Sequence, residues 1–172
     1  MDSLAYFKPE FHSLLHPHPI LWTAGSNPYE VSKAIIQCRM LSGRYRTESL
    51  ASHWSLNTPG FCLASTCTQI EENLEHILLH CHCPSYHPAR NKLVMLWKST
   101  KLPIILQLAN TVLASSSANL LQFILDPSTN PVVIRMSQEY GQEPLKIVFH
   151  LTRTWCFSIH KSRAKLLGRW AP

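Results

Sequence analysis

The stretch LKIVFHLTRTWCFSIHKSRAKLLGRW, residues 145–170, carries the longest periodic pattern in this chain of 172 residues. One stripe of residues recurs at helical spacing and occupies about a third of a helical wheel. It consists of Leu145, Val148, Phe149, Thr152, Trp155, Cys156, Ile159, Leu166, Leu167 and Trp170. Most basic side chains lie outside the stripe, although Arg163 intrudes on it. The pattern therefore predicts a long C-terminal amphipathic helix of about seven turns with a basic outer face.

Helix signals elsewhere in the chain are typical of a mainly α fold. Asn27 followed by Pro28 marks a helix start, because the asparagine can cap the helix and proline needs no N–H partner in the first turn. The apolar periodicity after it predicts a helix ending near Gly43, and Thr47 can open a second helix through Trp54. Further helices are expected over 74–81, 89–98, 104–109 and 118–125, with a loop over 126–131. Strands should be few, because no hairpin pattern stands out.

Composition suggests three regions within one domain. Residues 1–27 contain several prolines and scattered aromatic residues, and we expect an irregular N-terminal arm. Residues 28–99 should form a helix pair with a cysteine-rich insertion, and residues 100–172 a helical C-terminal region with the basic terminal helix. An apolar content of 45% is sufficient to bury a core.

Charge and hydropathy limit the possible partners and compartments. The net charge of +6 is local, since the six charged residues after Glu143 are all basic. A local basic excess permits a polyanionic partner. The N-terminus lacks the pattern of a signal peptide, and no apolar run reaches the roughly 20 residues of a membrane span. The sequence therefore favours the nucleus or cytoplasm over secretion and predicts no membrane contact, so the six cysteines should be reduced.

Three cysteines and a histidine follow the helix pair at the spacing C-x4-C-x8-H-x4-C. They are Cys62, Cys67, His76 and Cys81. Thiolates and imidazole are the ligands that Zn²⁺ prefers, and a structural zinc site needs four of them in a tetrahedral arrangement. The first two can face inward from a tight loop, and the last two can converge if the turn between them unwinds. The spacing predicts a small zinc knuckle of the CCHC type.

Two alternatives to this assignment remain open. The cysteines can be small buried residues and His76 a satisfied core side chain. The fourth ligand is also ambiguous, because His80 and Cys83 lie close to Cys81 in sequence. We expect Cys81, since it keeps the histidine and cysteine on one compact element. The acids Glu71, Glu72 and Glu75 are expected to form the solvated first turn of that element.

Five segments resemble one known family. They are HPHPILWTAGSNPYEVSKAIIQ (16–37), QCRMLSGRYRTESLASHWS (37–55), FCLASTC (61–67), LEHILLHC (74–81) and LTRTWCFSIHKSRAKLLGRW (151–170). Together they resemble the C-terminal zinc-knuckle region of reverse transcriptases from non-LTR (LINE-type) retrotransposons. The resemblance covers essentially the whole chain and maps the family's zinc ligands onto Cys62, Cys67, His76 and Cys81.

The resemblance implies a non-catalytic region downstream of a polymerase. Such regions are implicated in holding the element's RNA and target DNA during target-primed reverse transcription. The only aspartates are Asp2 and Asp126, so the Asp-Asp pair of a polymerase palm is absent from the sequence. The reverse transcriptase domain of the same polyprotein is an implied partner. A decayed or domesticated copy of such a transposable element is an alternative origin.

Nucleic-acid contacts are expected from basic and aromatic residues beside the knuckle and on the terminal helix. The candidates are Arg44, Tyr45, Arg46, Arg153, Lys161, Lys165 and Arg169. The basic side chains would contact phosphates, and Tyr45, His53 or Trp54 would stack on unpaired bases. The plainer interpretation is that the arginines cap or pair with neighbouring helices and that Trp54 belongs to the core.

Two further functions can be weighed against nucleic-acid binding. A thiol enzyme would need Cys156 beside His150 or His160, but Cys156 lies in the apolar stripe and the histidines lie off it, so an inert thiol is expected. A protein-interaction module would dock the stripe with Trp155 and Trp170 onto the polymerase domain or a second copy. Strong salt dependence favours nucleic acid over apolar docking.

Overall fold

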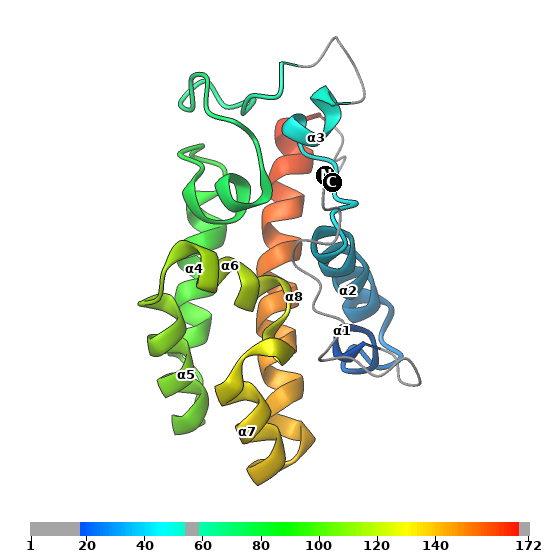
Figure 1. Cartoon of the computed structure of the whole chain (residues 1–172), viewed down its shortest axis with the longest axis vertical. Coiled ribbons are helices and arrows are strands. Elements are labelled where there is room, and N and C mark those ends of the chain that lie inside the picture. Colours follow the sequence, from blue (N-terminus) through cyan, green and yellow to red (C-terminus); the bar gives the residue numbers. More distant parts are fainter. Residues whose placement is uncertain (1–17, 54–58, 169–172) are drawn as a thin grey trace.

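The described part of the chain is an assembly of helices. The computed structural model describes residues 18–53 and 59–168 (Figure 1). Within these residues no strand occurs, and the one isolated β-bridge joins Phe61 and Glu71. The predicted mainly α fold is confirmed. The predictions for residues 1–17, Trp54, Arg169 and Trp170 lie outside the described residues.

Most helices begin where the sequence offers a cap or a proline in the first turn. The elements are α1 (Pro19–Trp22), α2 (Pro28–Leu41), α3 (Glu48–Ser52), η2 (His76–His80), α4 (His87–Lys98), α5 (Pro103–Leu113), α6 (Ser117–Leu125), η3 (Pro127–Thr129), α7 (Pro131–Tyr140) and α8 (Gln142–Leu166). The side chains of Asn27 and Thr47 accept hydrogen bonds from the first turns of α2 and α3, as the sequence predicted. These caps satisfy N–H groups that have no partner inside the helix.

Helix α8 lies at the centre of the molecule (Figure 1). It packs against α2, α4, α6 and α7, and it therefore contributes residues to the core on several sides. Val148, Phe149, Cys156 and Ile159 are completely buried. This single core includes residues from both the 28–99 and the 100–172 regions.

The buried Arg153 corrects the picture of α8 as a helix with one apolar stripe and a solvated basic face. Arg153 is only 2% exposed and donates hydrogen bonds to Thr23, and Arg163 is also buried. The helical wheel placed Arg153 outside the stripe because that analysis assumes that only one side of the helix packs against other elements. Helix α1 covers that side of α8, so the side expected to face solvent is also buried.

Helix α7 and the single turn of α1 were not predicted. The loop expected over 126–131 contains η3 and ends where Asn130 caps α7, with the side chain accepting hydrogen bonds from Val132 and Val133. Asn130-Pro131 repeats the pattern of Asn27-Pro28, so the signal for this helix start was present in the sequence. Within the expected irregular arm, α1 packs on α2 and α8.

Candidate metal centre

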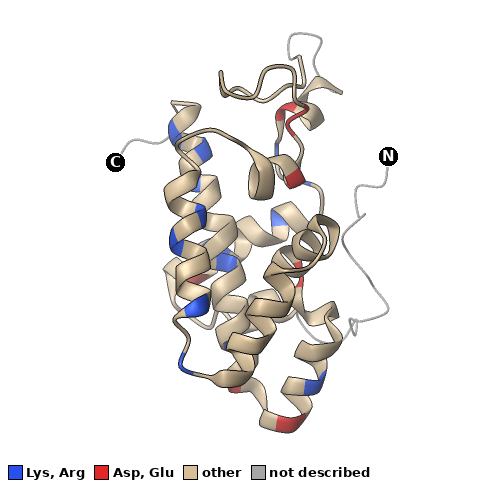
Figure 2. Cartoon of the chain, turned by 90° about the vertical axis from the view of Figure 1, so that its left-hand side faces the viewer, with Lys and Arg blue, Asp and Glu red and all other residues tan. Residues whose placement is uncertain are grey.

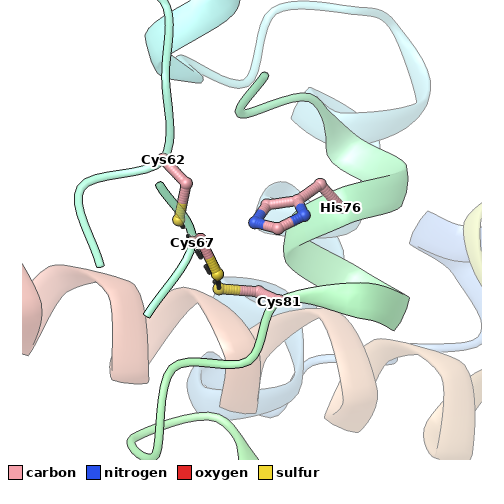
Figure 3. Close-up of side chains that lie close together, drawn as sticks. All are labelled: Cys62, Cys67, His76 and Cys81. Atoms are coloured by element: carbon pink, nitrogen blue, oxygen red, sulfur yellow. Dashed lines mark hydrogen bonds between the residues drawn. The ribbon is translucent and has the colours of Figure 1, made fainter. Parts of the chain in front are cut away.

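Three cysteines and one histidine converge at one end of the molecule. The donor atoms of Cys62, Cys67, His76 and Cys81 all lie within 4.8 Å of one another (Figure 3). Cys62 is half-buried, and the other three side chains are buried. This group of thiols and imidazole could hold a metal ion.

The separation of the sulfur atoms fits metal ligands better than a disulfide. The Sγ atom of Cys81 lies 3.6 Å from that of Cys62 and 3.7 Å from that of Cys67. Tetrahedral Zn–S bonds of about 2.3 Å place two sulfurs about 3.8 Å apart. A disulfide would require about 2.05 Å. The sulfur of Cys81 therefore lies from each of the other two sulfurs at nearly the separation of two corners of a tetrahedral site.

A tight loop carries Cys62 and Cys67. The N–H of Cys62 donates to the carbonyl of Ile70 at 2.8 Å, and the N–H of Cys67 donates to the carbonyl of Ala64 at 2.9 Å. Gln69 closes the loop in the left-handed region with a φ of 59°. These bonds fold residues 62–70 back on themselves, so that both sulfurs point to the same side (Figure 3).

A π-helical turn brings His76 and Cys81 together. In an α-helix, residues five positions apart lie about 140° apart around the axis. Here the chain forms the π-helix η2, and the N–H of Cys81 donates to the carbonyl of His76 at 2.6 Å. This i→i+5 bond places the two residues on one side of the turn. Asn73 fixes its start, because its side chain accepts a hydrogen bond from the N–H of His76 at 2.8 Å.

Burial and hydrogen bonds act differently on the four donors. The Nε2 atom of His76 is buried and has no hydrogen-bond partner among the described residues. Burial, followed by the nearby charge of Arg90, lowers the pKa of His76 and keeps the ring neutral. Burial raises the pKa of Cys62 and Cys81. For Cys67, burial is outweighed by hydrogen bonds, first the 3.3 Å bond from the His82 N–H, and the pKa is lowered.

The other candidates for the fourth ligand lie outside this cluster. His80 is exposed, and its Nε2 atom lies 3.4 Å from a carboxylate oxygen of Glu75. Cys83 is buried but does not belong to the group of converging donors. The structure thus places Cys81 with Cys62, Cys67 and His76, and it leaves His80 and Cys83 apart from them.

One predicted solvated acid, Glu72, is in fact buried and anchors the cysteine-rich segment from inside the molecule. Its side chain is 1% exposed, and its Oε1 atom accepts hydrogen bonds from Arg163 Nη2 at 2.6 Å and from the Glu48 N–H at 2.9 Å. The expectation was wrong because a helix-start pattern does not reveal a cation that comes from a distant helix. Through Glu72 the cysteine loop is attached to both α3 and α8.

An open cavity of about 290 Å³ lies beside the cluster. His76, His80 and His82 are among the side chains that line it. Of the four donor residues, His76 is the one that borders this cavity.

The residues predicted to bind nucleic acid divide into exposed and buried groups. Arg44, Arg46 and Lys165 are exposed, and Lys161 is half-exposed above the ring of Phe157. Tyr45 and Arg153 are buried, which excludes them from direct contact with nucleic acid in this conformation. In Figure 2, most Lys and Arg positions lie on the helices at the left of the picture, and Asp and Glu positions lie chiefly elsewhere.

Tyr45 has a different role from the predicted one. Its hydroxyl lies 3.1 Å from Nδ1 of His160, and its ring packs edge-on against that imidazole. Burial raises the pKa of Tyr45 to about 12. The side chain attaches the segment between α2 and α3 to α8, and it does not offer a ring for stacking on a base. His53, in contrast, is exposed.

The side chains considered for a thiol enzyme and for apolar docking, Cys156 and Trp155, also lie in the core. Cys156 is completely buried, and burial raises the pKa of its thiol. Trp155 is buried as well, with its indole N–H 3.4 Å from the carbonyl of Leu78. Trp155 is therefore unavailable for docking onto a partner.

Comparisons of the chain with protein-family models, curated proteins and solved structures give no match. Among the helices of residues 18–53 and 59–168, none combines the length and apolar character of a membrane span.

Proposed function

We propose that the chain is a zinc-stabilised, nucleic-acid-binding region of a LINE-type retrotransposon reverse transcriptase. The observation that carries this proposal is the convergence of Cys62, Cys67, His76 and Cys81, with all donor atoms within 4.8 Å of one another. These are the four positions onto which the family resemblance maps the ligands of a zinc knuckle. The region would support target-primed reverse transcription in the nucleus or cytoplasm without catalysing it.

The zinc ion would be structural. Three thiolates and one imidazole complete a tetrahedral shell, so no open position remains for a water molecule or a substrate. A catalytic zinc needs such a position. The ion would instead hold the loop of Cys62 and Cys67 against the turn of His76 and Cys81.

A basic ridge, formed by Arg39, Arg44, Arg46, Lys161 and Lys165, supports the nucleic-acid part of the proposal. The contact between Tyr45 and His160 places the Arg44–Arg46 segment beside the part of α8 that carries Lys161. Burial, followed by the charges of Arg163 and Arg39, lowers the pKa of His160, so Arg39 belongs to the same neighbourhood. Exposed cations gathered in this way attract phosphates and release counterions when they bind.

The zinc knuckle and the basic ridge are linked through α3. Arg46 lies two residues before Glu48, and the Glu48 N–H donates to the Glu72 side chain at 2.9 Å. Arg163 bonds both carboxylates, at 2.6 Å for Glu72 and 3.4 Å for Glu48. A metal-bound knuckle would therefore fix the chain that carries Arg44 and Arg46.

Binding of single-stranded RNA across a salt series tests the nucleic-acid role. The double variant Arg44→Ala/Arg46→Ala should weaken binding and make the slope of log K against log salt less steep by about 1.4, or about 0.7 for each phosphate that the variant no longer neutralises. The matched control is Lys98→Ala/Lys101→Ala, which removes two exposed cations outside the basic ridge. Equal affinity and slope for wild type and the Arg44→Ala/Arg46→Ala variant would overturn this role.

A protein-docking role is the second candidate, and one observation favours it. Phe61, Leu63 and Ile70 on the cysteine loop are exposed large apolar side chains. They replace the Trp155 stripe as the surface that would contact the polymerase domain. Docking of this kind should persist at high salt, unlike binding to phosphates.

A further inference from the structure

Arg90 on α4 donates three side-chain hydrogen bonds to the backbone of the turn that carries His76 and Cys81. Its Nη1 atom donates to the carbonyl of Cys81 at 2.6 Å, and its Nη2 atom donates to the carbonyl of Ile77 at 2.7 Å. Its Nε atom donates to the carbonyl of Leu78 at 3.2 Å. One guanidinium group thus binds three carbonyls of a single short segment.

These carbonyls need donors because the turn ends at Cys81. The last carbonyl groups of any helix lack partners within the helix, and burying them unpaired is costly. The five donors of a guanidinium are fixed in one plane, so the group can bind several carbonyls only if these keep one arrangement. The fork of Arg90 therefore fits the three carbonyls in the arrangement that the π-helical turn gives them.

Arg90 also meets the charge that a filled site would create. Three thiolates, one neutral imidazole and a divalent zinc ion add up to a net charge of −1. Arg90 interacts electrostatically with Cys81, Cys67 and His76, and no carboxylate among the described residues forms an ion pair with it. Its positive charge thus lies beside the cluster, with Nη1 2.6 Å from the carbonyl oxygen of Cys81, and no described carboxylate neutralises it.

We propose that Arg90 is the positioning residue of the metal centre: it holds His76 and Cys81 in converging positions and offsets the net charge of the filled site. This inference rests on the proposed zinc site. It assigns part of the metal affinity to a residue outside the C-x4-C-x8-H-x4-C pattern.

Zinc affinity of the full chain, measured by competition with a chelator, tests the proposal. Arg90→Lys keeps the charge but loses the fork, and Arg90→Gln keeps an amide donor but loses the charge. Both should bind zinc about 10–100-fold more weakly, the usual effect of removing a group that orients metal ligands. The Co²⁺-loaded variants should also show weaker and shifted visible bands, because the tetrahedron is less regular.

The control is Arg153→Lys, which alters another buried arginine, one that donates to the backbone carbonyls of Ile20 and Thr23 at α1. It should lower the thermal midpoint of the protein but leave zinc affinity within about twofold, since changes at distant sites without shared partners are nearly independent. Circular dichroism of the metal-free proteins reports whether each variant keeps its helices.

The outcomes separate the two proposals. Wild-type protein that binds no zinc overturns the proposed function itself. Wild-type protein that binds zinc, with Arg90→Lys and Arg90→Gln binding equally tightly, overturns the role of Arg90 alone. Loss of helix in the Arg90 variants that saturating zinc does not restore also overturns it, because Arg90 would then serve the fold in general.

Discussion

Glu30 on α2 joins two cations and one histidine at the junction of α2 and α8. Its Oε1 atom lies 2.6 Å from Lys33 Nζ, and its Oε2 atom lies 3.1 Å from His150 Nδ1 and 3.3 Å from Arg153 Nη2. Burial opposes ionisation of Glu30, but hydrogen bonds from Lys33 and His150 outweigh it and lower its pKa. A carboxyl group whose pKa is lowered by folding stabilises the protein above its ordinary pKa and loses this contribution as the pH falls.

The first prediction concerns this pH dependence. Glu30→Gln should reduce the free energy of unfolding at pH 7 by about 1–3 kcal/mol, because charge-assisted hydrogen bonds are lost. The difference between wild type and variant should shrink towards pH 3, where the wild-type carboxyl becomes protonated. Urea unfolding at the two pH values measures it, with Glu143→Gln as an exposed control. A difference that stays constant with pH would contradict this account of Glu30.

The second prediction concerns Arg163. Arg163→Met should destabilise the protein by about 3–5 kcal/mol in urea unfolding, because it leaves the carboxylate of Glu72 buried without its cation. Adding Glu72→Gln removes that stranded charge and keeps an acceptor for the Glu48 N–H, so the double variant should recover part of the loss. Lys165→Met is the exposed control and should change stability by less than about 0.5 kcal/mol. A double variant less stable than Arg163→Met would contradict the assignment.

At the scale of elements, the turn η2 is what makes a five-residue separation of ligands workable. The sequence predicted convergence only if the turn unwound, and the π-helical hydrogen bond between Cys81 and His76 provides this change. The resulting third prediction is that Cys81→Ser loses bound zinc, whereas Cys83→Ser and His80→Asn retain it. Elemental analysis of the purified variants measures this. Retained zinc in Cys81→Ser together with loss of zinc in Cys83→Ser would contradict this assignment and identify Cys83 as the fourth ligand.

Much of the element order could be predicted from local signals. Caps and prolines located the starts of α2 and α3, and the apolar periodicity located α4, α5, α6 and α8. The start of α7 was missed although Asn130-Pro131 has the same local chemistry as Asn27-Pro28. In the site, ligand chemistry and spacing identified the four residues that the structure brings together.

The remaining features depend on contacts between distant residues, which periodicity does not contain. Arg163 and Glu72 are 91 positions apart, and Tyr45 and His160 are 115 apart. A helical wheel uses the sequence of one helix alone and contains no information about α1, so it places Arg153 on the outside of α8. The anchoring role of Arg90 was missed for the same reason, since its three acceptors are backbone carbonyls with no side-chain signature.

At the scale of the whole molecule, α8 connects the knuckle to the rest of the fold. Arg163 and Trp155 bind Glu72 and Leu78 on the cysteine-rich side, while the apolar residues of α8 pack with α2, α6 and α7. The cysteine-rich segment is small compared with this core, and in the proposed function a zinc ion joins its four donors. The core should therefore outlast the loss of metal.

The fourth prediction follows from this difference. Removing zinc with a chelator should increase hydrogen exchange mainly over residues 60–85, because this segment carries the four donors that would lose their common ion. The amides in the middle of α8 should stay protected, since that helix packs in the core on several sides. Mass-spectrometric hydrogen exchange with and without chelator measures this. Complete loss of protection in α8 on metal removal would mean that the core depends on the knuckle.

The measurement that tests the central claim most directly is the zinc content of the purified protein, wild type against Cys62→Ser. The account predicts one zinc per wild-type chain and little or none in the variant, since a structural site loses its closed shell when one of four ligands is removed. A wild-type chain without zinc, or a Cys62→Ser chain with the same zinc content as wild type, would contradict the claim that these four side chains hold a metal.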